Sequence, residues 1–349
     1  MKPLCPFGTH RVIEPKGVLP QAAEKIDATP ICYDNEIMID VDVLNIDSAS
    51  FHQIKEACQE DESRMKAMIE KIIQDKGKMQ NPVTKSGGML IGRIDEIGKN
   101  YPQSDLRVGD AIATLVSLSL TPLHLEEIIS INMDNEQVKI RGKAILFESG
   151  ILEVIPQDLD ERLVLAGLDV CGAPAQIKHL AKENDTVFII GAAGKSGLLC
   201  AYQAKINVGP KGRVIGLVNE ETQRAELDQL NVCDDILLMD ARDGLGVYNK
   251  IKEITGGKLC DLSINVVNVP DTEMTTILAT KDRGIVYFFS MATSFTKAAL
   301  GAEGVKKDVT MMIGNGYTKD HAKITLDILR NHQGLKNVFN ARYVGGEKS

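Results

Sequence analysis

The sequence lacks the cysteine patterns that mark disulfide-rich and zinc-binding proteins. Its seven cysteines, an odd number, are scattered and include no C-x-x-C pair, which is typical of a reduced, intracellular protein. The chain has no run of about 18 apolar residues that could cross a membrane. Its N-terminus lacks the charged-then-apolar pattern of a signal peptide. We therefore expect a cytoplasmic protein with no membrane partner.

The chain also has fewer basic than acidic residues. The chain has 40 lysines and arginines against 48 acidic residues, a net charge of -8, which disfavours a nucleic-acid-binding surface. Apolar residues make up 44% and charged residues 25% of the chain, as in ordinary soluble proteins. The length of 349 residues is sufficient for two domains with separate cores. We expect small-molecule ligands and no nucleic acid.

The phosphate-binding loop of nucleotide hydrolases is absent, although part of its sequence is present. Gly194-Lys195-Ser196 matches the end of that motif. The motif also requires a glycine five positions before its Gly-Lys pair, where this chain has Ile189. This excludes a nucleotide hydrolase of that class.

The stretch 186–205 carries the clearest pattern in the chain. Residues 186–190 are mostly β-branched or aromatic, as in a strand buried on both faces of a parallel sheet. Three glycines at spacing three follow, and apolar residues then recur at helical spacing. A strand, a glycine turn and a helix in this order predict the start of a dinucleotide-binding βαβ unit.

Each glycine of this turn has a physical role. Gly191 allows a tight reversal, Gly194 lets a pyrophosphate approach the backbone, and Gly197 lets the helix pack closely on the strand. The N–H groups and dipole at the helix start favour the negative charge of the phosphates. The predicted cofactor-binding loop consists of Gly191, Ala192, Ala193, Gly194, Lys195, Ser196 and Gly197.

A second strand is expected at 213–218, followed by an acidic residue that binds the ribose about 20 residues after the turn. Asn219, Glu220 and Glu221 stand there, so the expected cofactor is NAD rather than NADP. Asn268 and the pair Ser290-Met291 end two later strands. Ligands bind at the carboxyl ends of such strands, and we expect these residues near the nicotinamide half of the cofactor.

The other segments predict two domains of an α/β protein. A Pro- and Gly-rich arm (1–30) precedes a half-exposed strand at 36–43. A helical pattern at 53–79, with Ser48 or Ser50 as N-cap, ends at Gly77. Short antiparallel strands fill 87–155. Six parallel strands of a doubly wound sheet follow from 186 to 313, and the chain closes with a helix at 319–331 and a last strand or arm.

A barrel-like half followed by a dinucleotide-binding half resembles the medium-chain dehydrogenase/reductase superfamily. The turn Val108-Gly109-Asp110 and the glycine spacing at 191–197 are similar to its quinone-reductase-like branch. The resemblance implies a GroES-like antiparallel β-barrel catalytic domain at 1–155, with a helical insertion at about 53–80 and completed by about 318–349. It also implies a doubly wound parallel Rossmann NAD-binding domain at 156–317.

The chain departs from the zinc-dependent members of this superfamily. They carry a cysteine in the turn where this chain has Leu44-Asn-Ile-Asp47, and a His-Glu pair where it has Ser86-Gly87-Gly88. Their lobe of four closely spaced cysteines is absent as well. A catalytic zinc needs about three protein ligands, so we predict an oxidoreductase without a metal.

Two further stretches, 5–21 and 45–52, resemble the family of 3,5-diaminohexanoate dehydrogenases. That resemblance covers the whole chain and implies NAD-dependent oxidative deamination of a diamino acid in anaerobic lysine breakdown. A zinc-free enone or quinone reductase and a non-catalytic NAD-sensing protein are the alternatives. The expected assembly is a homodimer or a higher homo-oligomer.

Oxidative deamination requires a general base and charged groups that hold a second ammonium and a carboxylate. Asp47 and His52 are the candidates for acid–base work, because they lie on the turn where relatives place a metal ligand. Their structural alternatives are a helix N-cap for Asp47 and a packed or solvated His52. The weaker candidates for substrate binding are His10, Arg11, Glu14, His124 and Glu148.

Overall fold

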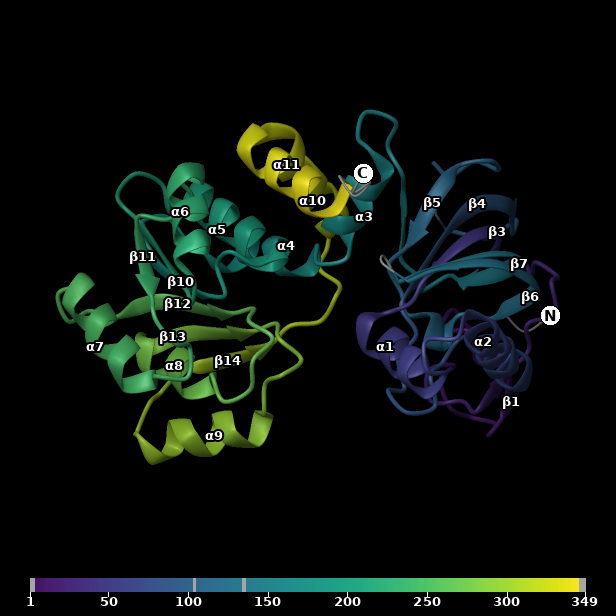
Figure 1. Cartoon of the computed structure of the whole chain (residues 1–349), viewed down its shortest axis with the longest axis horizontal. Helices are drawn as coiled ribbons and strands as arrows, with labels where there is room; N and C mark the ends of the chain where they lie inside the picture. The colour runs from purple at the N-terminus through teal and green to yellow at the C-terminus, as the bar shows by residue number, and fades with distance from the viewer. Residues whose placement is uncertain (1–3, 103–104, 134–135, 345–349) are drawn as a thin grey trace. The chain divides into compact units, whose positions relative to one another are not determined.

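The computed structural model describes residues 4–102, 105–133 and 136–344. The chain forms two compact units, Met1–Gln157 and Asp158–Ser349, each with its own sheet (Figure 1). No helix among the described residues is long and apolar enough to span a bilayer. The division lies two residues beyond the predicted domain boundary at 155/156.

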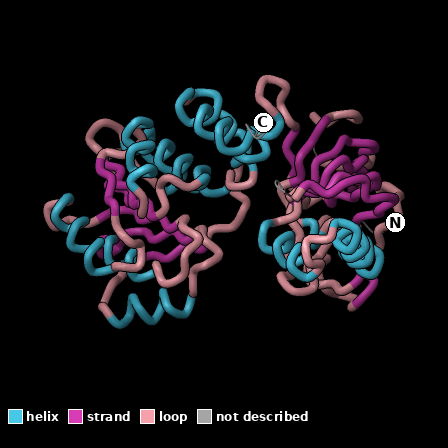
Figure 2. The backbone as a smooth tube through the Cα atoms, viewed as in Figure 1, coloured by secondary structure: helices cyan, strands magenta, loops and turns pink. Residues whose placement is uncertain are grey.

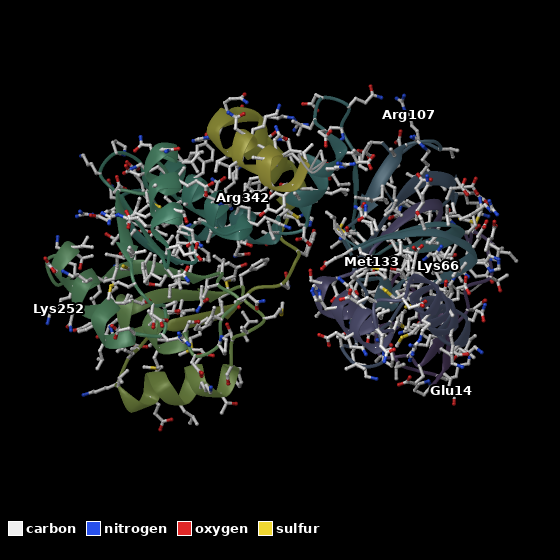
Figure 3. The ribbon with its side chains drawn as sticks, viewed as in Figure 1. Glu14, Lys66, Arg107, Met133, Lys252 and Arg342 are labelled. Carbon is white, nitrogen blue, oxygen red and sulfur yellow. The ribbon has the colours of Figure 1, made fainter. Side chains whose placement is uncertain are left out.

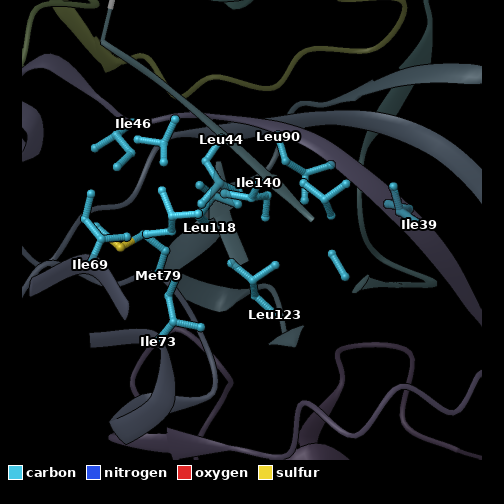
Figure 4. Close-up of a cluster of buried hydrophobic side chains, with 14 of the residues drawn as sticks. Ile39, Leu44, Ile46, Ile69, Ile73, Met79, Leu90, Leu118, Leu123 and Ile140 are labelled. Carbon is cyan, nitrogen blue, oxygen red and sulfur yellow. The ribbon is translucent and has the colours of Figure 1, made fainter. Parts of the chain in front are cut away.

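The first unit is built on an antiparallel sheet (magenta in Figure 2). Among the described residues its strand order is β6-β7-β3-β4-β5-β8, so that β6 and β8 are the end strands of the hydrogen-bonded ladder. Its apolar face packs against two helices, and Figure 4 shows Ile39 and Leu44 of β3 in the resulting core. The strands are β3 (Glu36–Asn45), β4 (Met89–Ile97), β5 (Ala111–Thr114), β6 (Leu123–Asn132), β7 (Gln137–Phe147) and β8 (Leu152–Val154).

The single helix predicted over 53–79 is wrong, because the segment forms α1 (Ser48–Ala57) and α2 (Glu62–Lys76). Gln59 and Glu60 adopt positive φ between them, which breaks the helical path. Asp61 caps the second helix by accepting a hydrogen bond from the N–H of Arg64. Gly77 ends α2 in the left-handed conformation, as predicted. The buried stripe of α2 belongs to the core.

The second unit is built on a parallel sheet in the order β11-β10-β9-β12-β13-β14, which confirms the predicted doubly wound sheet. Helices cover both faces, with α5 and α6 on one and α7 and α8 on the other (Figure 1). The strands are β9 (Thr186–Ile190), β10 (Arg213–Val218), β11 (Asp235–Leu238), β12 (Cys260–Asn265), β13 (Thr280–Phe288) and β14 (Thr310–Ile313). The helices are α5 (Lys195–Val208), α6 (Glu221–Leu230), α7 (Gly244–Ile254), α8 (Glu273–Ala279) and α9 (Phe295–Gly304).

The C-terminal segment differs from the prediction. The helix α10 (His321–Asn331) matches the helix predicted at 319–331, whereas α11 (Gln333–Phe339) and a helical turn at 340–344 replace the expected last strand or arm. They belong to the second unit rather than completing the first. The buried face of α10 packs on α3 (Glu161–Leu168) and α4 (Gly172–Leu180). The neighbouring helices α3 and α4 thereby remove this apolar face from solvent.

Candidate active site

The glycine turn after β9 has the geometry of a pyrophosphate cradle. Gly191 has a φ of 84°, a conformation that favours glycine. A Cβ on Gly197 would lie 2.1 Å from the carbonyl oxygen of Gly191, so the close packing of α5 on the strand requires glycine there. Gly194 is the N-cap residue of α5, and a Cβ on it would meet only the Gly191 oxygen, at 3.3 Å. The space in front of this helix N-terminus is therefore open.

A cavity of about 770 Å³ lies over this turn, at the carboxyl ends of the parallel strands. Five predicted cofactor residues line it, from the turn and from the ends of β10 and β12: Gly191, Ala193, Gly194, Asn219 and Asn268. Its size and its open helix N-terminus fit a dinucleotide, whose phosphates would face the N–H groups of α5.

The other predicted cofactor residues lie outside this lining. Ala192 and Gly197 are buried. Lys195 pairs with Asp169, at 2.7 Å. Glu220 is exposed just before α6. Ser196, Ser290 and Met291 are not part of the lining either; the Ser290 hydroxyl oxygen accepts the N–H of Ala292, and Met291 is 84% exposed.

The sequence analysis did not predict that the segment after β11 forms part of the cavity wall. Asp240 and Arg242 line it there, with Gln223 of α6 nearby in the lining. No glycine motif marks this strand end, and only the parallel pairing of β10 with β11 brings it beside the predicted ribose-binding segment.

The C-terminal turn also contacts the glycine loop. Arg342, labelled in Figure 3, donates from Nη1 to the carbonyl oxygen of Ala193, at 2.9 Å, and pairs with Glu226 of α6. The ammonium of Lys195 lies 4.9 Å from the ring centre of Tyr343. Residues 342 and 343 therefore hold the predicted cofactor loop in place, through contacts that sequence spacing cannot reveal.

In the first unit, Asp47 is the N-cap of α1, the role weighed as its structural alternative. Its Oδ1 accepts the N–H of Ser50 at 3.0 Å, and its Oδ2 accepts the Ser50 hydroxyl at 2.8 Å. Ser48 and Ser50 were the predicted caps, and this prediction is wrong. Ser50 instead bonds to the hydroxyl of Thr84 at 2.6 Å. Both oxygens of Asp47 thus have structural partners.

For the Nε2 ring nitrogen of His52, in contrast, no hydrogen-bond partner is found among the described residues. Its Nδ1 lies 3.1 Å from the carbonyl oxygen of Ser48 and 3.4 Å from Oε1 of Glu136. Because both neighbours are acceptors, the proton of the neutral ring is assigned to Nδ1. Nε2 then keeps its lone pair on a side chain that is 67% exposed. Glu136, which the sequence analysis missed, also accepts the hydroxyl of Ser48.

His10 and Arg11, predicted to bind substrate, form a buried ion cluster with Glu36. The Arg11 side chain is 1% exposed and donates twice to Glu36, at 2.7 Å each, while Nε2 of His10 lies 2.8 Å from the same carboxylate. Burial raises the pKa of Glu36, but the hydrogen bonds from Arg11 and His10 outweigh it and hold the pKa below the ordinary value. The cluster links the N-terminal arm to β3. Because Glu36 occupies the Arg11 guanidinium, this group is not available to bind a ligand.

We expect Arg11→Met to destabilise the first unit by about 3–5 kcal/mol, because it leaves the Glu36 carboxylate buried without its cation. The measurement is denaturant unfolding, with Arg141→Met at an exposed ion pair as the control. The folded-state pKa of Glu36 lies below its ordinary 4.5, so this stability is present above pH 4.5 and is lost as the pH falls through the folded-state pKa. In the variant, protonation relieves the buried charge, and the difference should shrink in acid. An equal loss in both variants would contradict the cluster's role.

The remaining substrate candidates are not brought together. Glu14 is exposed on β1 (Val12–Glu14), at the edge of the unit in Figure 3. His124 on β6 lines a separate hollow of about 470 Å³ beside α2. Glu148 follows β7 and accepts a hydrogen bond from Asn35 at 3.3 Å. These three residues stay predictions without a common site.

No group of three or more His, Cys, Asp or Glu side chains in the described part of the chain is arranged to hold a metal ion. Because the ligand positions of the zinc-dependent relatives are unfilled in the sequence, we expect prolonged treatment with a chelator to leave the activity unchanged. Metal analysis of the purified protein accompanies the assay. Stoichiometric zinc, with activity lost on its removal and regained on its return, would contradict the prediction.

Solved structures share this fold at low sequence identity. CurK enoyl reductase aligns with a TM-score of 0.54 and 14% identity, covering 87% of this chain and 81% of its own. An alcohol dehydrogenase from Thermotoga maritima aligns with a TM-score of 0.54 and 15% identity, covering 89% and 86%. These similarities confirm the predicted fold, which combines a doubly wound parallel sheet with an antiparallel sheet.

Closer relatives are found by sequence. Residues 10–156 match the family model of the L-erythro-3,5-diaminohexanoate dehydrogenase N-terminal domain. The L-erythro-3,5-diaminohexanoate dehydrogenase of Fusobacterium nucleatum is 55% identical over 345 residues, 99% of this chain and 100% of the relative. That of Acetoanaerobium sticklandii is 56% identical over 341 residues, 97% and 99% of the two chains. Such identity over essentially the whole length shows that the chain belongs to the L-erythro-3,5-diaminohexanoate dehydrogenase family.

Proposed function

We propose that this protein oxidatively deaminates L-erythro-3,5-diaminohexanoate to 5-amino-3-oxohexanoate and ammonium, with NAD, in lysine fermentation. The observation that carries the proposal is the identity of 55% and 56% to two dehydrogenases of that name over nearly the full chain. The dinucleotide-sized cavity over the glycine turn supports it. The test is the formation of NADH from NAD and this diamino acid by the purified protein.

The chemistry sets two tasks for the side chains. An aliphatic ammonium has a pKa of about 10.4, so a base must remove a proton from the C3 ammonium before the C3 hydride can leave and the imine can form. When bound, NAD supplies the hydride acceptor. A water molecule then adds to the imine, and ammonium departs. In total the substrate, NAD and one water yield the 3-oxo acid, ammonium, a proton and the reduced cofactor.

His52 is the group whose geometry best suits the base. Nδ1 carries the proton toward Ser48 and Glu136, which leaves Nε2, without a partner among the described residues and on an exposed side chain, to accept one. Glu136 would position the ring and stabilise its protonated form, as a carboxylate does beside a catalytic histidine. The proposed role of Asp47 is structural: it caps α1, the helix that contains His52.

NAD rather than NADP is the proposed cofactor. Asn219 lines the cavity at the end of β10, and Glu220 follows it. A carboxylate at this position binds the two ribose hydroxyls and repels a 2′-phosphate. A homodimer or larger homo-oligomer in the cytoplasm remains the proposed state of the protein.

The enone-reductase alternative is supported by the fold alone, since enoyl reductases and quinone oxidoreductases share it at 14% to 16% identity. The NAD-sensing alternative predicts cofactor binding without turnover. Assays with an enone and NADPH, and with the diamino acid and NAD, separate all three.

A further inference from the structure

The ends of β10 and β11 lie side by side at the adenosine end of the proposed cofactor site. Val218 pairs with Leu238 in parallel register, and the N–H of Met239 donates to the Val218 carbonyl oxygen at 3.0 Å. Asn219 follows the first strand and Asp240 follows the second, and both line the 770 Å³ cavity. Two acidic segments therefore leave the sheet at the same edge.

Asp240 and Arg242 form a closely bonded pair within this wall. Oδ2 of Asp240 accepts from Nη2 of Arg242 at 2.7 Å, and Oδ1 accepts from Nε at 3.0 Å. Oδ1 also accepts the backbone N–H of Arg242 at 2.9 Å. These hydrogen bonds lower the pKa of Asp240 to about 2, so the carboxylate is ionised throughout the neutral range.

The turn that carries the pair is fixed from both sides. The N–H of Asp243 donates to the carbonyl oxygen of Asp240 at 3.0 Å. The hydroxyl of Thr275, buried on α8, donates to the carbonyl oxygen of Ala241 at 2.6 Å. Asp240 and Arg242 are thus held at the cavity wall by their own backbone as well as by each other.

The charges decide which dinucleotide this wall accepts. NADP differs from NAD by a 2′-phosphate, which carries nearly two negative charges at neutral pH. The Nε–Nη2 edge of a guanidinium is the part that binds a phosphate through two parallel hydrogen bonds. In this protein Asp240 occupies that edge of Arg242, and Glu220 adds a further carboxylate at the N-cap of α6, after the end of β10.

We propose that Asp240 is a specificity-determining residue for NAD, which excludes NADP by occupying the guanidinium edge of Arg242. The inference deepens the proposed cofactor preference and rests on the proposed dinucleotide site. It assigns the discrimination to two strand ends, since Glu220 repels the 2′-phosphate and Asp240 withholds the cation that would bind it. Removal of Asp240 converts Arg242 into a phosphate ligand.

The test uses the Asp240→Asn variant of the full chain. Its affinities for NADH and for NADPH are measured by calorimetric titration and compared with those of the parent. Asparagine keeps an oxygen that can accept the backbone N–H of Arg242 and preserve the turn, while it removes the carboxylate that pairs with the guanidinium. The affinity for NADPH is expected to rise about 10-fold, as for a new charge-assisted contact, while the affinity for NADH changes less than about 2-fold. The double variant Asp240→Asn/Arg242→Met is expected to lose that gain.

Glu253→Gln provides the charge control, because it removes one carboxylate from the same unit, at an exposed pair with Lys250 on α7. It is expected to leave both affinities as in the parent. An unchanged NADPH affinity in Asp240→Asn would overturn the proposal, and so would a gain that persists in the double variant or appears equally in Glu253→Gln. The readout needs no amino-acid substrate, so it stays interpretable if the proposed reaction fails. Failure of the parent to bind NADH would instead overturn the cofactor site.

Discussion

Gly194→Val is expected to weaken NADH binding by at least about 100-fold, which corresponds to about 2.7 kcal/mol, while the protein stays folded. Gly194 has an extended backbone, with φ −72° and ψ 170°, a conformation that valine adopts readily. A Cβ would meet only the Gly191 oxygen within the protein. The valine methyl groups therefore occupy the space that the pyrophosphate needs, and the loss falls on the ligand.

Calorimetric titration with NADH and a thermal unfolding curve measure the two parts of this prediction. Gly304→Val is the matched control, because Gly304 is exposed at the end of α9 and a Cβ there meets nothing within 4 Å. It should retain both NADH affinity and unfolding temperature. Normal NADH binding by Gly194→Val would mean that the cofactor lies elsewhere in the protein.

His52→Ala is expected to lower kcat by about 10²- to 10⁴-fold, the usual contribution of a general base, with NADH affinity unchanged. In the parent, the rate of deamination should rise with pH, because the substrate must lose a proton before hydride transfer. Steady-state kinetics across the pH range, with direct titration of NADH, separate the chemical step from cofactor binding. Glu136→Gln should reduce kcat less and shift the pH profile, as a positioning residue does.

Two variants control for structural effects on this turn. Asp47→Asn keeps a capping side chain and should retain most of the activity, because the proposed role of Asp47 is to begin α1. His179→Ala removes an exposed histidine from α4 and should have no effect. Full activity in His52→Ala would void the assignment of the base and leave the reaction class standing. A large loss of kcat in Asp47→Asn, with NADH affinity unchanged, would instead assign the role of general base to the Asp47 carboxylate.

The geometry of the glycine turn was predictable from sequence because the interactions that determine it are local. A strand, a tight turn and a helix N-terminus are specified by about twenty consecutive residues, and Gly191 and Gly197 have the predicted roles. The break between α1 and α2 was not predictable, because Gln59 and Glu60 carry no glycine signal for their positive φ. The doubly wound sheet followed from the alternation of strands and helices.

Contacts between residues that are far apart in the chain could not be predicted from the sequence. Arg11 and Glu36 are 25 positions apart, and only the folded arm shows that they neutralise each other. Glu136 reaches His52 across 84 positions, and Arg342 reaches the glycine loop across 149. The apolar face of α10 could be read as a stripe, but its position in the second unit depended on the neighbours that cover it.

Incubation of the purified full-length protein with NAD and L-erythro-3,5-diaminohexanoate tests the proposed reaction most directly. Reduced cofactor, ammonium and the 3-oxo product are followed together. The proposed reaction predicts one NADH and one ammonium for each molecule of diamino acid consumed. NADH binding without any turnover of the diamino acid, or reduction of an enone by NADPH in its place, would contradict it.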